Sequence, residues 1–131
     1  MKPQVCDWDD IKHLLNNDDL GDAKFTPLKK RRIWFVTKDN QTSEIQGVAS
    51  LIVLSKTSVR ISSVYVPSIW RDKGIATDLI KSMLGYCAYE GFKKIDARAK
   101  RGNMYQRLGF LKMKTFKCGS GLYIRHLLND S

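Results

Sequence analysis

The apolar residues between 31 and 66 fall into three runs whose composition is typical of β-strands. β-Branched and aromatic residues dominate 31–36 (RRIWFV), 47–55 (GVASLIVLS) and 58–66 (SVRISSVYV). A short polar turn near Lys56 and Thr57 separates the last two runs. This spacing predicts a β-hairpin.

After Gly74 the spacing of apolar residues changes to a helical period. A single apolar stripe recurs every three or four residues, and Gly91 follows it as a C-terminal cap would. The pattern predicts a long amphipathic helix over 74–90. The stripe comprises Ile75, Ala76, Leu79, Ile80, Met83, Leu84, Cys87 and Ala88.

The C-terminal segment predicts a strand, a short helix and two further strands. Residues 93–99 have a strand pattern, and a short helix around 103–108 ends at Gly109. Two strands, at 110–118 and 122–128, flank a turn of sequence GSG.

Near the N-terminus, Asp7 is placed to cap a helix through Asn16, because apolar residues recur there at helical spacing. Residues 17–32 are polar and contain Gly21 and Pro27, which predicts a loop. The order is therefore helix, loop, three strands, long helix, strand, short helix and two strands. It predicts an α/β fold with a mixed sheet of about six strands flanked by helices.

The length of 131 residues predicts a single domain over 1–131, large enough for one hydrophobic core. We expect a cytoplasmic protein, because no apolar run approaches the ~20 residues of a membrane helix and the first residues lack the apolar core of a secretory signal.

Three widely spaced cysteines, Cys6, Cys87 and Cys118, do not cluster with either histidine. They predict reduced thiols, with neither a disulfide framework nor a metal site.

The charge balance predicts attraction to polyanions. Lys and Arg number 23 against 13 Asp and Glu, which gives a formal net charge of +10. Nucleic acid and phosphorylated small molecules are both partners of the matching sign. The balance says nothing about the fold.

The stretch WRDKGIATDL, residues 70–79, joins the predicted hairpin to the long helix. A glycine at a helix start lets a ligand approach unpaired N–H groups, where the helix dipole, Arg71 and Lys73 add positive charge. This combination predicts a phosphate or pyrophosphate site. The alternative is a capped helix entry with solvated charges. Neither G-x-x-x-x-G-K-[ST] nor G-x-G-x-x-G occurs in the chain.

Two segments together resemble the GNAT superfamily of N-acetyltransferases. Arg71-x-x-Gly74-x-Ala76, with Val66 on the preceding strand, resembles the pyrophosphate loop of that family. MYQRLGF at 104–110 resembles its Y-x-x-x-G-F segment. The resemblance covers roughly residues 46–127 and implies a GNAT-like acyl-CoA N-acyltransferase fold with acetyl-CoA as acyl donor and no metal.

The resemblance also implies roles for individual residues. Backbone amides of a splayed strand would pair with the pantetheine arm, and Tyr105 would protonate the departing thiolate. The alternative for Tyr105 is a packed aromatic ring beside Phe110. The implied cofactor-binding residues are Val64, Tyr65 and Val66 on the strand, Arg71, Asp72, Lys73, Gly74, Ile75 and Ala76 in the loop, and Asn103.

The sequence departs from the family pattern in two places. Family members often carry a carboxylate on the strand before the loop, whereas this strand has none. Asp96, or a water held by Ser62 or Ser63, is the candidate replacement, and an ion pair is the alternative for Asp96. Many relatives have an asparagine seven residues before the tyrosine, where this chain has Arg98.

The acceptor is expected to be a primary amine. A basic run at 29–32 and the basic residues of 93–107 suggest an amine attached to nucleic acid, with Trp34 and Trp70 available for stacking. The alternative for these charges is a solvated basic surface. Protein, peptide and small amines remain open, as does a basic nucleic-acid-binding module without transferase activity. The chain is expected to be a monomer or a homodimer, in which 122–128 could be an edge strand that pairs between subunits.

Overall fold

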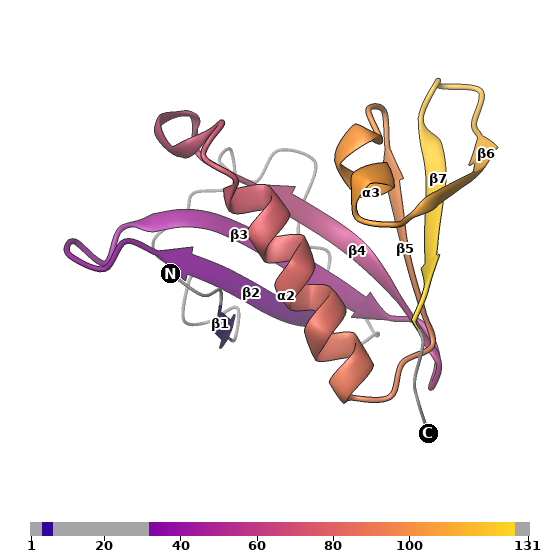
Figure 1. Ribbon diagram of the computed structural model, residues 1–131, viewed down its shortest axis with the longest axis horizontal. Helices are drawn as coiled ribbons and strands as arrows, with labels where there is room; N and C mark the ends of the chain where they lie inside the picture. The colour runs from indigo at the N-terminus through magenta and orange to yellow at the C-terminus, as the bar shows by residue number, and fades with distance from the viewer. Residues whose placement is uncertain (1–3, 7–31, 128–131) are drawn as a thin grey trace.

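The computed structural model describes residues 4–6 and 32–127, which form a seven-stranded mixed sheet with a long helix across one face (Figure 1). The strand order is β1-β2-β3-β4-β5-β7-β6. The strands are β1 (Gln4–Cys6), β2 (Arg32–Lys38), β3 (Ile45–Val53), β4 (Ser58–Tyr65), β5 (Lys94–Ala99), β6 (Leu111–Thr115) and β7 (Gly121–His126). The helices are α2 (Ile75–Tyr89), α3 (Asn103–Arg107) and the 3₁₀ turn η2 (Ser68–Trp70).

The connections confirm the predicted α/β architecture. Strands β2, β3 and β4 pair antiparallel, as the predicted hairpin requires. Strand β5 returns parallel to β4 because the chain crosses over through α2, and β5, β7 and β6 are again antiparallel.

The hydrophobic core lies between α2 and the sheet. The apolar stripe of α2 buries Leu79, Ile80 and Met83 completely, and strand residues such as Leu51 and Ile95 face it from the sheet. Each fully buried side chain of this size contributes roughly 1.5–3 kcal/mol. The core therefore fixes where the N-terminus of α2 meets the sheet.

Strands β4 and β5 pair at one end only and then separate. Their register runs from Ser58 opposite Lys94 to Ile61 opposite Ala97. The pairing of β4 with β3 shifts between Ser50 and Leu51, which leaves Ser62 without a partner as a β-bulge. A bulge bends and twists its strand, so β4 diverges from β5 beyond this point (Figure 1). The result is an open β4 edge from Ser62 to Tyr65.

The structure differs from the sequence-based prediction at an edge of the sheet and in one strand position. Strand β1 was not predicted, because three residues are too few to show an alternating pattern. The prediction of an edge strand at 122–128 is wrong, because β7 lies between β5 and β6 and the edge is β6. The predicted helix 7–16 lies outside the described residues, as does the loop except for Arg32, which begins β2.

Two cysteines in the described part of the chain, Cys87 and Cys118, are free thiols. Among the described residues no group of His, Cys, Asp and Glu is arranged to hold a metal ion. Within the same part of the chain, no helix combines the length and apolar character needed to span a membrane.

Candidate functional site

A pocket of about 440 Å³ opens at the N-terminus of α2. It lies where the end of β4, the loop after η2, the first turn of α2 and the end of α3 come together. The lining residues are Val66, Trp70, Arg71, Asp72, Gly74, Ile75, Ala76, Thr77 and Arg107. Most residues of the loop 71–76, predicted from the sequence as a phosphate site, line this pocket. Thr77 and Arg107 also line it but were not predicted as site residues.

The backbone of this loop offers unpaired N–H groups to the pocket. Gly74 is the N-cap residue of α2, has φ +81° and makes no side-chain cap. The first helical hydrogen bond runs from the N–H of Asp78 to the carbonyl of Gly74, at 3.0 Å. The N–H groups of the first turn before Asp78 therefore have no helical partner. Together with the helix dipole they form a candidate anion-binding end.

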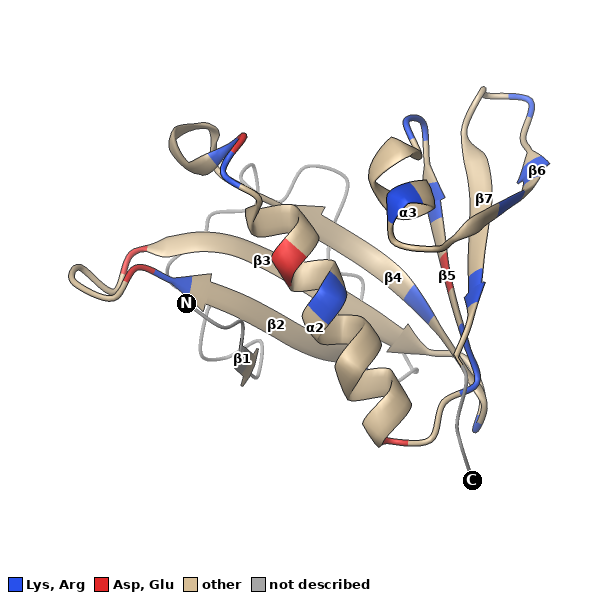
Figure 2. Ribbon diagram, viewed as in Figure 1, with Lys and Arg blue, Asp and Glu red and all other residues tan. Residues whose placement is uncertain are grey.

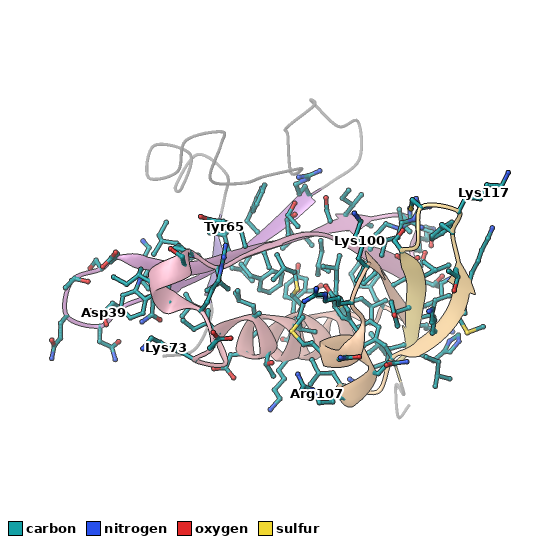
Figure 3. The ribbon with its side chains drawn as sticks, turned by 90° about the horizontal axis from the view of Figure 1, so that it is seen from above. Asp39, Tyr65, Lys73, Lys100, Arg107 and Lys117 are labelled. Atoms are coloured by element: carbon teal, nitrogen blue, oxygen red, sulfur yellow. The ribbon has the colours of Figure 1, made fainter. Side chains whose placement is uncertain are left out.

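Two arginines add positive charge to this helix end. The Nε of Arg71 donates to the carbonyl of Val66 at 3.0 Å, which ties the loop to the end of β4. Arg107, in the last turn of α3, lines the pocket from the other side. The Asp72 carboxylate also belongs to the lining, and Asp72 has a left-handed backbone, with φ 62°. Figure 3 shows Lys73 and Arg107 on the α2 side of the sheet.

The donor set of the pocket fits a diphosphate. Trp70 Nε1 is buried and has no hydrogen-bond partner, so the pocket lining contains a donor that a ligand oxygen could satisfy. Free helix N–H groups and arginine donors are the groups that bind phosphates in proteins. A side chain replacing the hydrogen of Gly74 would meet no atom within 4 Å, so the approach to the backbone is open.

The predicted pantetheine strand lies beside the pocket. Val64 and Val66 pack their side chains against the core, and Tyr65 is half-buried. Backbone groups alternate in direction along a strand, so every other N–H and C=O of this segment points away from β3 toward the open edge. The open edge and the pocket adjoin at Val66.

Tyr105 is packed beside Phe110, as the structural alternative for this residue described. Its ring is 7% exposed, contacts Phe110 edge-to-face at 5.2 Å and stacks on Tyr123 at 6.1 Å between ring centroids. Burial raises the pKa of Tyr105 to about 12, so its hydroxyl stays protonated at neutral pH. Tyr105 is not among the residues that line the pocket, and its role as proton donor stays a prediction.

Asp96 forms an ion pair, which was the alternative to a general-base role for this residue. Arg60 Nε donates to Asp96 Oδ1 at 2.8 Å, and Arg60 Nη2 donates to Oδ2 at 3.2 Å. The hydrogen bond with Asp96 is the main cause of the raised pKa of Arg60. This bidentate pair engages both carboxylate oxygens and fixes Asp96 against Arg60, which favours the structural interpretation over a general-base role.

Ser50 and Ser63 stand opposite each other on neighbouring strands. Both hydroxyl oxygens are buried without a hydrogen-bond partner, while Ser62 is exposed. Directly opposite residues have side chains on the same face of a sheet. Two buried hydroxyls at one place are suited to hold a water molecule.

Other predicted contributors lie elsewhere. Asn103 is exposed at the start of α3 and does not line the pocket. Arg98 places its guanidinium carbon 4.7 Å from the ring centre of Phe116. The stacking role predicted for Trp34 is wrong, because this side chain is 3% exposed, whereas Trp70 is half-buried in the pocket wall.

Several solved acetyltransferase structures share this fold. A mutant form of the spermidine/spermine N-acetyltransferase SpeG from Vibrio cholerae has a TM-score of 0.75 at 16% identity and covers 96% of this chain and 94% of that chain. A GNAT family acetyltransferase from Elizabethkingia anophelis with acetyl-CoA bound has a TM-score of 0.64 at 18% identity, with 73% and 76% covered. Aminoglycoside 6'-acetyltransferase type Ii has a TM-score of 0.66 at 18% identity, with 76% and 72% covered. Among curated proteins, none matches the sequence.

The family model described as acetyltransferase (GNAT) domain matches residues 23–126. This range includes the pocket loop, the splayed strands and the segment around Tyr105. It favours the transferase over a binding module without activity. The chain therefore belongs to the GNAT acetyltransferase family and is an acyltransferase.

Proposed function

We propose that this protein transfers the acetyl group of acetyl-CoA to a primary amine. The observation that carries the proposal is the pocket at the N-terminus of α2, where free backbone N–H groups, Arg71 and Arg107 converge beside an open strand edge. When bound, acetyl-CoA supplies an activated acyl group as a thioester. Reduced free thiols at Cys87 and Cys118 fit a cytoplasmic site of action.

In this proposal each part of the site holds a different part of the donor. The loop from Arg71 to Ala76 binds the diphosphate with its N–H groups and with the arginine charges. The open edge of β4 at Val64, Tyr65 and Val66 supplies backbone groups for the amide-containing arm. Asn103 is the remaining candidate contact, from the start of α3.

The acceptor amine must lose a proton to attack the thioester. A lysine-type amine with a pKa of ~10.4 is neutral in about one molecule in 2,500 at pH 7, whereas an α-amine near ~8 is neutral in about one in ten. No carboxylate lies on β4, and Asp96 is held by Arg60. We therefore assign proton removal to a water bound by the hydroxyls of Ser63 and Ser50. Ser63→Ala should lower turnover, while Ser62→Ala at the exposed bulge is the matched control.

The departing thiolate needs a proton. Tyr105 is protonated at every physiological pH, because burial raises its pKa to about 12. In this proposal its hydroxyl donates that proton, and the rings of Phe110 and Tyr123 hold it in place. The acid is thus positioned by the same packing that raises its pKa.

The acceptor is an amine attached to nucleic acid or to protein. Two structural neighbours are named as spermidine/spermine and aminoglycoside acetyltransferases, and both of those acceptor classes carry primary amines. The net charge of +10 favours an acceptor on a polyanion. A screen of amines with a free-thiol readout identifies the class directly.

Isothermal titration calorimetry with acetyl-CoA tests the proposed donor site. Gly74→Glu should abolish binding, because it places a carboxylate where the diphosphate lies and strains a residue at φ +81°. Gly74→Ala is the matched control, since it shares the strain without the charge and should weaken binding less. Wild-type protein that shows no heat at millimolar acetyl-CoA contradicts the proposal.

A further inference from the structure

The positive charge of the protein is concentrated in its C-terminal part. Residues 93–127 contain ten Lys and Arg and a single acidic residue, Asp96. Asp96 is already paired with Arg60. Figure 2 shows the basic residues spread over β5, α3, β6 and β7, whereas the half with β2, β3 and α2 carries both signs. Within residues 93–127, the basic side chains therefore far outnumber the acidic side chains that could neutralise them.

Five residues at one end of this surface form what we call the Phe116 cluster: Arg98, Lys100, Lys114, Phe116 and Lys117. Arg98 and Lys114 are both aligned with Leu122 of the intervening strand β7, so they lie on one face of the sheet. The Arg98 guanidinium carbon is 4.7 Å from the Phe116 ring centre, and Lys114 Nζ is 5.2 Å from it. Both cations therefore contact the same aromatic ring.

The other two cations are Lys100, directly after β5, and Lys117, in the turn between β6 and β7. Lys100 lies close enough to Cys118 to contribute to the lowered pKa of that thiol, which is due mainly to its hydrogen bond with Ser120. Lys117 is exposed, at the far end of the molecule from Lys73 (Figure 3). Among the described residues, none of the four cations of the cluster makes an ion pair. Their mutual repulsion would be relieved by a polyanion.

The chemistry of the cluster fits nucleic acid. The guanidinium of Arg98 lies over the Phe116 ring, and an arginine side chain offers donors to phosphate and a plane on which a base can stack. The exposed apolar side chains nearby, Leu111 at 65% and Met113 at 60%, lie on a five-residue edge strand. A membrane-binding surface usually presents an amphipathic helix with a large apolar face, which this sheet edge does not provide.

The cluster also borders the opening between the splayed strands. Ala97 is the last residue of β5 that pairs with β4, and Arg98 follows it directly. A phosphate bound by Arg98 would therefore lie next to the point where β4 and β5 separate. We propose that the Phe116 cluster binds the phosphates of a nucleic acid, and, resting on the proposed acetyl transfer, that this nucleic acid carries the acceptor amine.

Fluorescence anisotropy with a labelled single-stranded RNA oligonucleotide, titrated at several salt concentrations, tests the surface. The logarithm of the wild-type association constant should fall linearly with the logarithm of salt concentration. The double variant Arg98→Ala with Lys114→Ala should have a slope shallower by ~1.4, at ~0.7 for each lost phosphate contact. The matched control, Lys56→Ala with Lys81→Ala, removes equal charge from exposed positions outside the cluster and should keep the wild-type slope.

Two further variants separate charge from folding. Arg98→Lys with Lys114→Arg keeps both charges and should restore most of the slope. Phe116→Leu keeps the charges but removes the ring that both cations contact, and should weaken binding without flattening the slope. Equal slopes in the cluster variant and the control overturn the proposal, as does a flat wild-type response. Tighter binding to vesicles of phosphatidylserine and phosphatidylcholine than to RNA also overturns it.

Calorimetry with acetyl-CoA on the same variants keeps this result distinct from the proposed function. The cluster variants should bind acetyl-CoA as the wild type does, because the pocket at α2 lies outside the cluster. If the wild-type protein binds RNA through the cluster but does not bind acetyl-CoA, the proposed RNA surface stands and the proposed acetyl transfer fails. If it binds acetyl-CoA but not RNA, the proposed acetyl transfer stands and the proposed RNA surface fails.

Discussion

At the scale of single residues, Tyr105 combines a structural role with a proposed chemical one. Its ring is buried between Phe110 and Tyr123, and this burial keeps the hydroxyl protonated. The sequence alone presented packing and proton donation as alternatives. The structure shows the packing and leaves proton donation compatible with it.

Tyr105→Phe should lower turnover by ~10²–10⁴-fold, which is the typical contribution of a general acid. The affinity for acetyl-CoA should change little, because Tyr105 does not line the pocket. Steady-state kinetics together with calorimetry separate the two quantities. An unchanged turnover would remove Tyr105 from the proposed mechanism.

The same residue should make the fold sensitive to alkali. The pKa of Tyr105 is about 12 in the folded protein against 10 for an exposed tyrosine, so the folded state holds the proton more tightly. The stabilisation that comes from this raised pKa is therefore fully present below pH 10 and is lost as pH rises from about 10 to 12, by ~2–3 kcal/mol. Urea denaturation at several pH values measures this loss. Tyr105→Phe should reduce it, leaving the contribution of Cys87, whose pKa burial raises to about 12.

At the scale of elements, the position of α2 on the sheet decides the geometry of the candidate anion-binding end. Gly47 of β3 lies directly beneath the first turn of α2, where an added Cβ would be 2.7 Å from Ile75 Cγ2 and 3.0 Å from Leu79 Cδ1. The absence of a side chain at Gly47 therefore allows the close contact between helix and sheet. No pattern in the sequence pointed to this requirement.

Gly47→Ala should lower the free energy of unfolding by ~1–3 kcal/mol, because it overpacks the core. It should also weaken acetyl-CoA binding, because it pushes the N-terminus of α2 away from β4. Gly85→Ala is the control in the middle of the same helix, where an added Cβ meets nothing within 4 Å. This control should stabilise the protein by ~0.5–1 kcal/mol. Acetyl-CoA affinity unaffected by Gly47→Ala would argue against this coupling.

At the scale of the whole molecule, two groups of strands meet where β4 and β5 pair. The pairing covers Ser58 to Ile61 on β4, and the ion pair of Arg60 with Asp96 lies within it. The Asp96 side chain is 6% exposed and that of Arg60 is 35% exposed. This junction keeps the two groups together below the point at which they diverge.

Arg60→Leu should destabilise the protein by ~3 kcal/mol or more, because it leaves the Asp96 carboxylate buried and unpaired. Adding Asp96→Leu should recover much of that loss, since neither charge is then buried alone. Urea denaturation of the wild type, both single variants and the double variant gives the coupling energy. Additive effects of the two substitutions would show that the ion pair does not join the strands energetically.

Much of the fold was readable from the sequence because local patterns encode it. The stripe of α2, the hairpin of β3 and β4, and the glycines at both ends of α2 indicated their elements directly. Strand β1 and the edge position of β6 were missed. Both depend on which distant segments pair, and local patterns carry little of that information.

The sequence by itself determined the order of the elements, the loop at 71–76 before the long helix and the excess of positive charge, because each depends on residues that are adjacent along the chain. Only the tertiary structure decided that Arg107 faces this loop, that Asp96 is held by Arg60 and that Ser50 stands opposite Ser63. These groups are distant in sequence. The bulge at Ser62 and the crossover through α2 bring them together, and the energy of those contacts exists only once the core has formed.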